Sequence, residues 1–348
     1  MVVNNISIDH DSKEVKLSKI LKAHKVDHDF ISLEEKAYFD SYNIRLSIGT
    51  KISKIDNLMH DIGLQLNGFA VPTGKVVPSE GVYKIEVQRT DIVPKSLSEL
   101  IKNAPKNYTT PICLGTDKFG KDLIVDLNKI PNLLIGGTTG SGKSVLLHNI
   151  ILSLIASDAN IFLVDPKYVE FSMYTDCQQV LSIDKEIDDF VITLDLLKNK
   201  MQERYQMLSA SKCRNITEFN RKNVFGQKLK PIVMVIDEWA DLVLREKSLL
   251  KEICYLAQKG RAAGISIVLA TQRPSVNIIS GTIKANFPGR ICLKVASQID
   301  SKVILDRSGG EKISSVGSAL YLDGFNQNPI LFKSPFVEDP EEFLRLKL

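Results

Sequence analysis

Eight consecutive residues have the composition and spacing of a loop that binds phosphate groups. They read GTTGSGKS and stand between a short apolar run at 133–135 and a Leu- and Ile-rich segment at 145–151. This order predicts a strand, a glycine-rich turn and a helix, which is the context such a loop needs to bind a nucleoside triphosphate. The turn points backbone N–H groups inward, and the start of the helix adds its positive end. The predicted ATP-binding residues are Gly137, Thr138, Thr139, Gly140, Ser141, Gly142, Lys143 and Ser144.

Two carboxylates at 237 and 238 supply the expected second half of this site. They end the apolar run 231–236, which predicts a buried strand. Lys143 is placed to reach the β- and γ-phosphates, while Ser144 and Asp237 would hold Mg²⁺. Glu238 would orient and deprotonate the attacking water. ATP and Mg²⁺ are therefore the expected cofactors.

Two further polar segments follow apolar runs. Gln272 follows the run 265–270, and since the carboxyl ends of parallel strands face the ligand crevice, we expect it to sense the γ-phosphate or to position water. Asp165-Pro-Lys167 follows the run 161–164. Lys167 and Glu170 would form either a structural pair or a DNA-facing tip, and the residues alone leave both open.

The elements that position these residues alternate along the chain from about residue 108. Amphipathic spacing predicts a long helix over 187–208. The alternation predicts an α/β fold in which a mostly parallel sheet, carrying the phosphate loop, is flanked by helices on both faces. The expected strands are 112–117, 123–127, 133–135, 161–164, 232–236, 265–270, 291–295 and 319–322.

A smaller α+β pattern precedes this region. Residues 51–66 have helical spacing, and residues 43–48, 75–77 and 82–87 have strand-like patterns. We therefore expect three regions: a polar, partly helical segment at 1–40, a small α+β subdomain with its connector at 41–107, and the ATPase domain at 108–348.

Composition excludes several classes of protein. The 348 residues carry a formal net charge of +4, which is too small to identify a partner. No apolar run approaches the roughly eighteen residues of a membrane span, and no signal-peptide pattern opens the chain. Five scattered cysteines without CxxC spacing indicate a reducing compartment. We expect a cytoplasmic location.

Several motifs, read in order, are shared with one family. They include GTTGSGKS, VDPKYVEFSMY (164–174), VIDEWADL (235–242), AQKGRAAGISIVLATQRPS (257–275), IKANFPGRI (283–291) and IDSKVILD (299–306). Over about residues 41–343, the chain resembles the motor of the FtsK/SpoIIIE family of DNA translocases. The small subdomain is similar to that family's alpha subdomain, and the rest to its RecA-like beta subdomain.

The resemblance implies a hexameric ring around double-stranded DNA, with ATP sites between subunits. Each site would take an arginine from a neighbour, for which Arg290 is the matching residue and Arg261 the reserve. The alternative for Arg290 is a salt bridge at the start of a strand. Lys302, at a position where the family has arginine, and Lys333 would contact DNA phosphates.

The expected activity is an ATPase that moves or pumps double-stranded DNA with little sequence preference. Two alternatives stay open: a conjugative coupling ATPase with a relaxase or membrane-bound partner, and a secretion-type ATPase that acts on protein. The family's full-length members carry membrane helices and often a winged-helix domain. We expect neither in this chain, so the resemblance does not extend to septal anchoring or to the reading of oriented DNA sequences.

Overall fold

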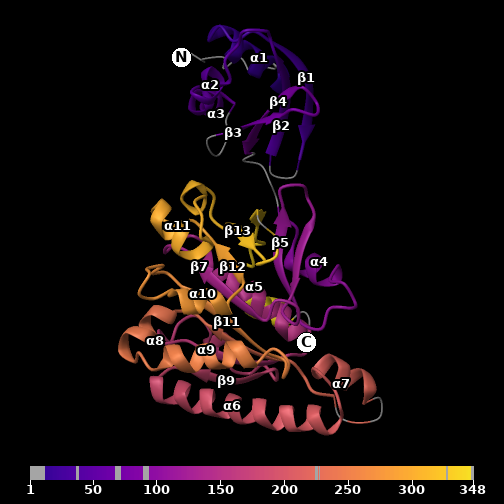
Figure 1. The fold of residues 1–348 in the computed structure, drawn as a ribbon, viewed down its shortest axis with the longest axis vertical. Coiled ribbons are helices and arrows are strands. Elements are labelled where there is room, and N and C mark those ends of the chain that lie inside the picture. Colours follow the sequence, from indigo (N-terminus) through magenta and orange to yellow (C-terminus); the bar gives the residue numbers. More distant parts are fainter. Residues whose placement is uncertain are drawn as a thin grey trace, which may run out of the picture. The chain divides into compact units, whose positions relative to one another are not determined.

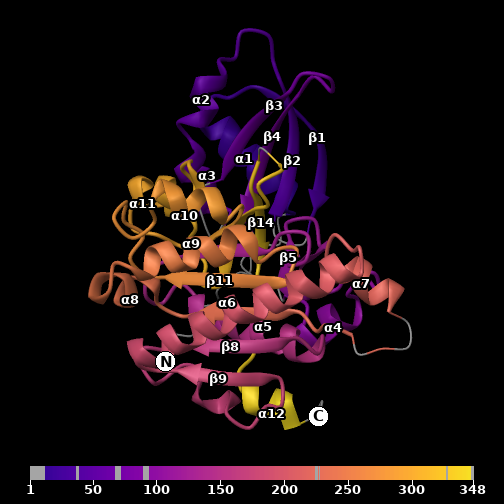
Figure 2. The same ribbon diagram turned by 60° about the horizontal axis from the view of Figure 1, so that its bottom comes forward.

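A ten-stranded mixed sheet carries the phosphate loop. The computed structural model describes residues 12–36, 39–66, 72–88, 94–223, 226, 228–326 and 328–345. The strand order is β6-β5-β14-β13-β12-β7-β11-β10-β8-β9. Neighbouring strands from β12 to β9 pair in parallel, whereas the pairs from β6 to β12 are antiparallel. Figure 2 shows β8 and β9 side by side at one end of the sheet.

The strand bounds mostly follow the apolar runs of the sequence. β9 and β14 were not predicted, and β12 is shorter than the run at 291–295 suggested. The strands are β5 (Pro111–Asp117), β6 (Asp122–Asp126), β7 (Asn132–Gly136), β8 (Asn160–Val164), β9 (Val180–Asp184), β10 (Ile232–Ile236), β11 (Ile265–Thr271), β12 (Gly289–Cys292), β13 (Ser318–Leu322) and β14 (Ile330–Lys333).

Helices cover both faces of this sheet (Figure 1). Side chains alternate across a strand, so Leu133 and Ile135 of β7 join the core with α5, while Leu134 joins the core with α6, α8 and α9. The fold is therefore the predicted RecA-like α/β type. The helices are α4 (Leu97–Lys102), α5 (Lys143–Ala156), α6 (Ile187–Ala210), α7 (Ile216–Lys222), α8 (Trp239–Arg245), α9 (Leu249–Lys259), α10 (Gly281–Asn286), α11 (Gln298–Leu305) and α12 (Pro340–Arg345), with short 3-10 turns at Ser172–Tyr174 and Gly310–Lys312.

A four-stranded antiparallel sheet, ordered β1-β2-β4-β3, forms the other unit. Its core includes Leu17, Ile20 and Leu21, so the first helix packs into this unit instead of standing apart. The predicted helix at 51–66 is two short helices interrupted at residues 57 and 58. The elements are α1 (Lys13–Ala23), β1 (His28–Glu35), β2 (Phe39–Leu46), α2 (Ile52–Asp56), α3 (Met59–Gln65), β3 (Thr73–Val77) and β4 (Val82–Gln88).

The compact units divide the chain differently from the sequence-based regions. One unit contains residues 1–93 with 118–120, and the other contains 94–117 with 121–348. The main boundary between the units lies between residues 93 and 94, whereas the sequence placed it after residue 107. The difference arises because Leu97 and Leu100 of α4 are buried in the core of the large sheet. Residues 1–11 of the predicted N-terminal segment lie outside the described part of the chain. No described helix combines the length and apolar character needed to cross a bilayer.

Candidate nucleotide-binding site

The phosphate loop connects the end of β7 to the first residue of α5. Gly140 and Gly142 have positive φ values of 77° and 98°, which glycine adopts readily. A Cβ on Gly142 would lie 2.9 Å from the backbone nitrogen of Gly317, so a side chain would also collide there. The sequence therefore forms the predicted strand, turn and helix, and the start of α5 points its backbone N–H groups into the loop.

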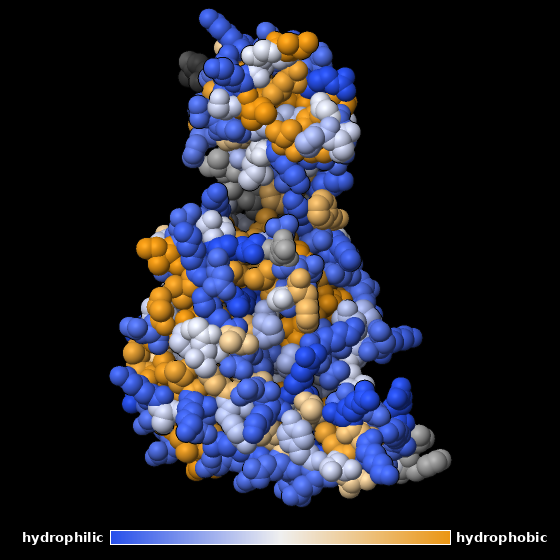
Figure 3. All heavy atoms as spheres, viewed as in Figure 1, coloured by the Kyte–Doolittle hydropathy of each residue, from blue (hydrophilic) through white to orange (hydrophobic). Residues whose placement is uncertain are grey.

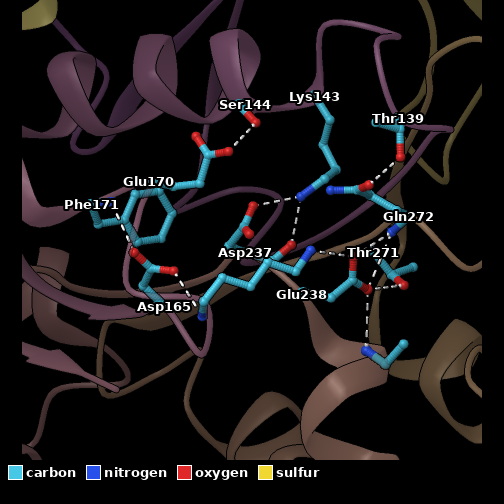
Figure 4. A network of polar contacts seen from close by, with 12 residues as sticks. Thr139, Lys143, Ser144, Asp165, Glu170, Phe171, Asp237, Glu238, Thr271 and Gln272 are labelled. Carbon is cyan, nitrogen blue, oxygen red and sulfur yellow. Dashed lines mark hydrogen bonds and ion pairs between the residues drawn. The ribbon is translucent and has the colours of Figure 1, made fainter.

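Lys143 and Asp237 form a buried ion pair at the centre of the site (Figure 4). The Lys143 ammonium donates to Asp237 Oδ1 at 2.5 Å and to its backbone oxygen at 2.7 Å. The side chains are only 3% and 1% exposed, so each charge depends on the other for compensation. Asp237 Oδ2 is buried without a hydrogen-bond partner among the described residues.

Glu238 lies beside this pair, and protein donors surround its carboxylate. It accepts hydrogen bonds from the Thr271 hydroxyl at 2.6 Å and from the Gln272 N–H at 2.9 Å. The Lys167 ammonium is 3.8 Å from Oε2. Glu238 is 2% exposed and caps the start of α8, where it accepts a longer hydrogen bond of 3.4 Å from the Ala240 N–H. These contacts fix the direction of the carboxylate.

Gln272 lies opposite the phosphate loop, as expected for a residue at the carboxyl end of a parallel strand. The Thr139 hydroxyl donates to its Oε1 at 2.6 Å, which ties the loop to the end of β11. Thr139, Lys143, Asp237, Glu238 and Gln272 thus converge from three neighbouring parallel strands and the loop (Figure 4).

The structural pair expected between Lys167 and Glu170 is wrong, because the two side chains contact other residues. The Asp165 carboxylate accepts from Lys167 N–H at 3.2 Å and from Phe171 N–H at 3.1 Å, which folds the segment over the site. Lys167 then faces Glu238, while Glu170 accepts from the Ser144 hydroxyl at 3.0 Å. The sequence signal was the position of this segment at the carboxyl end of a parallel strand, the same signal that identified Asp237 and Gln272.

His148 lies behind Glu170 on α5. Its Nδ1 is 2.8 Å from the Tyr174 hydroxyl, and its Nε2 is 3.8 Å from Glu170. Burial lowers the pKa of His148, although the charge of Asp237 acts in the opposite direction. The imidazole is thus held mainly neutral near pH 7.

Neither candidate arginine contacts the loop of its own chain in the described structure. Arg290 forms an ion pair with Asp306, and its other donors reach the backbone oxygens of Phe287 and Lys284. Burial alone would raise the pKa of Asp306, but Lys284 and Arg290 hold it below its usual value. Arg261 is exposed and donates to the backbone oxygen of Lys129. The strand-start salt bridge expected as the alternative for Arg290 is therefore present.

The two candidate DNA-binding lysines differ in exposure. Lys302 is exposed on α11, with its side chain in no ion pair among the described residues. Lys333 donates to the backbone oxygen of Val316 at 2.5 Å, and burial lowers its pKa. Only Lys302 is presented to solvent without a competing contact of this kind.

The residues at the site fit a magnesium ion that is shared with phosphate. The unpartnered Asp237 Oδ2 and the Ser144 hydroxyl are oxygen donors of the type that Mg²⁺ prefers. Within the described ranges, no group of three or more His, Cys, Asp or Glu side chains could hold a metal on its own. This pattern suits an ion that takes most of its ligands from phosphates and water.

Comparison with known proteins matches this site and its surroundings. A family model described as the FtsK/SpoIIIE family matches residues 97–276. A protein named DNA translocase FtsK from Clostridium acetobutylicum is 37% identical over 350 residues, covering 95% of this chain and 46% of the relative. DNA translocase SftA from Bacillus subtilis is 36% identical, covering 84% and 32%. The chain therefore spans less than half the length of these relatives.

Solved structures share the fold at lower identity. The conjugation coupling protein TcpA of pCW3, in a monomer form with ATPγS, has a TM-score of 0.69 at 24% identity, covering 97% of this chain and all of that one. The cytoplasmic domain of the secretion ATPase EccC from Thermomonospora curvata has a TM-score of 0.60 at 22% identity, covering 71% of this chain and 31% of that one. At such identities, the likeness establishes the fold.

Proposed function

Because the chain belongs to the FtsK/SpoIIIE family, we propose that it hydrolyses ATP to move along or pump double-stranded DNA as a hexameric ring. The observation that carries the proposal is the convergence of Lys143, Asp237 and Glu238 beside the phosphate loop. The DNA substrate is supported by relatives named DNA translocases.

ATP binding would replace one partner of Lys143. Its ammonium now neutralises Asp237, and the β- and γ-phosphates offer it the same negative charge. Ser144 and Asp237 would hold Mg²⁺, which neutralises phosphate charge when bound. Because the Thr271 hydroxyl and the Gln272 N–H fix the Glu238 carboxylate, it is oriented to accept a proton from water. Gln272, linked to Thr139, would sense the γ-phosphate.

The ring and its grip on DNA belong to the same proposal. A neighbour's Arg290 would have to leave Asp306 before it could stabilise phosphate charge, whereas Arg261 is exposed. Lys302 would contact the DNA backbone, and Lys333 could do so only by leaving Val316. The five cysteines are scattered along the chain without CxxC spacing, which favours a reducing compartment, and we propose a cytoplasmic location.

The test is the ATPase rate of the full chain with and without long duplex DNA, together with displacement of a triplex-forming strand. We expect stimulation by DNA, triplex displacement and loss of both in Lys143→Ala. An ATPase rate that DNA leaves unchanged at every salt concentration would overturn the proposal. Stimulation by peptide and not by DNA would favour the secretion-type alternative.

A further inference from the structure

A polar cleft lies at the amino ends of the parallel strands of the large sheet, whereas the phosphate loop lies at their carboxyl ends. It encloses about 700 Å³ between the turn before β7, the end of α6, helix α7 and the end of α9. Helix α7 precedes the amino end of β10, whereas α8 follows its carboxyl end, and Figure 1 shows the two helices on opposite sides of the sheet. The cations that line the cleft are Lys129, Arg214, Arg221, Lys259 and Arg261.

These five cations are exposed, and none of them forms an ion pair with another described residue. Glu218 also lines the cleft, but its carboxylate is already engaged by Lys222 at 2.9 Å and by the Arg214 N–H at 2.9 Å. Lys129 and Lys259 lie over the rings of Tyr108 and Tyr255, and Arg261 donates to the Lys129 backbone oxygen. The positive charges still repel one another, because no carboxylate forms an ion pair with any of the five. Such a cluster suits a ligand that brings the missing negative charge.

Positive charge is dense in the segment that contributes Arg214 and Arg221 to this cleft. Residues 212–230 contain six Lys and Arg and one Glu, a net charge of +5, whereas the complete chain carries only +4. The rest of the chain is therefore slightly negative. In Figure 3 the surface over α7 is strongly hydrophilic. The small net charge of the chain therefore includes one segment with a net charge of +5, which is large enough to attract polyanions.

The other groups in the cleft indicate which polyanion fits. Asn128, Asn215, Thr217 and Gln258 add hydrogen-bond donors of the kinds that contact phosphate oxygens. Three of the five cations are arginines, whose planar forks bind phosphate in bidentate fashion. Ten of the twelve residues that line the cleft are polar or charged, which disfavours membrane insertion.

We propose that this cleft binds the phosphate backbone of double-stranded DNA, as a contact separate from the ATP site and from Lys302. The identity of the polyanion rests on the proposed function, whereas the anion-binding character rests on the cleft alone. Binding here would be independent of base sequence and would weaken with salt, because it releases counterions from the duplex.

The experiment compares the full chain with Arg214→Ala/Arg221→Ala. Neither arginine side chain makes a hydrogen bond or ion pair with a described residue, so the double substitution removes charge without breaking internal contacts. Arg245→Ala/Lys247→Ala is the matched control, because it removes two exposed positive charges at the end of α8. Binding of a labelled random-sequence duplex is measured from low to moderate salt, and binding of a fluorescent ATP analogue reports on the ATP site.

We expect the cleft variant to bind the duplex at least about tenfold more weakly at low salt. Its plot of log affinity against log salt should be shallower by about 2, one for each lost phosphate contact. ATP-analogue binding should not change, and Arg214→Lys/Arg221→Lys should recover part of the affinity. Duplex affinity and slope equal to those of the control would overturn the inference, as would polyglutamate that binds the cleft more tightly than the duplex does.

Failure of the inference and failure of the proposed function give different patterns. If the cleft variant binds duplex like the control while DNA still stimulates wild-type ATPase, only the inference fails. If the wild-type protein neither binds duplex nor responds to it, the proposed function fails, and the DNA assignment of the cleft fails with it.

Discussion

The charged residues at the two ends of the parallel strands differ in burial and pairing. We call the end with the phosphate loop the carboxyl edge and the end with the basic cleft the amino edge. At the carboxyl edge, Lys143 and Asp237 are buried and neutralise each other, and Glu238 is fixed by three hydrogen-bond donors and an ion pair with Lys167. At the amino edge, the cations of the cleft are exposed and lack ionic partners among the described residues. Buried, paired charges make a site that is rigid and sensitive to single substitutions. Exposed, unpaired charges make a site in which each side chain contributes nearly independently to the binding free energy, and that contribution depends on salt.

The largest single effect should come from Glu238→Gln. The amide keeps the size of the side chain but cannot accept the proton, so kcat should fall by about 10²- to 10⁴-fold while ATP binding stays within a few-fold. Glu246→Gln, at the other end of the same helix, is the exposed control. Steady-state ATPase and nucleotide binding measure the two quantities, and a variant that keeps half of the wild-type rate would contradict the role of Glu238.

Lys143→Ala should have the largest effect on stability at the carboxyl edge. It leaves Asp237 buried without its partner, which should lower the free energy of unfolding by about 3–5 kcal/mol. Urea denaturation measures the loss. Lys302→Ala, an exposed control, should stay within about 0.5 kcal/mol. Lys143→Met/Asp237→Leu should be less destabilised than the sum of its single variants, and strict additivity would argue against the coupling.

Thr271→Val should have a smaller effect on catalysis. The valine fills the same space but removes the 2.6 Å hydrogen bond that holds Glu238, so kcat should fall by about tenfold. Thr271→Ser keeps the hydroxyl and should retain most of the rate. Equal rates for the Val and Ser variants would show that this hydrogen bond does not position the carboxylate.

The burial of His148 should make the free energy of unfolding depend on pH. Its pKa is lowered by burial in the folded chain, so below about pH 6.5 the unfolded chain binds a proton that the folded chain resists. Above that pH, His148 does not lower the free energy of unfolding. As the pH falls further, the free energy of unfolding should decrease by at most about 1.4 kcal/mol per pH unit, until the pKa of His148 in the folded chain is reached. Denaturation at pH 7.5 and 5.5 should show a smaller difference for His148→Gln than for the wild-type chain.

The smallest effect on stability should come from the amino edge. Arg214→Ala/Arg221→Ala should keep the wild-type free energy of unfolding within about 0.5 kcal/mol, with any change toward higher stability at low salt because repulsion is relieved. Thermal denaturation at two salt concentrations tests this. A loss of several kcal/mol would mean that these arginines serve the fold, and the contrast between the edges would disappear.

Local patterns predicted much of the nucleotide site. GTTGSGKS specifies its own turn, and the rule that carboxyl ends of parallel strands share an edge brought Asp237, Glu238 and Gln272 to the loop. The same rule applied to residues 165–171, yet it could not choose the partners of Lys167 and Glu170. Those partners depend on how Asp165 folds the segment back through two backbone hydrogen bonds.

The sequence by itself determined the phosphate loop, the acidic strand end and the fold class, because each depends on residues close together in the chain. The tertiary structure decided the rest. It packed α1 into the small unit, paired Arg290 with Asp306, and gathered the basic cleft from four segments between residues 128 and 262. Contacts between distant residues depend on packing and on the direction of each side chain, and neither is encoded in the spacing of residues along one segment.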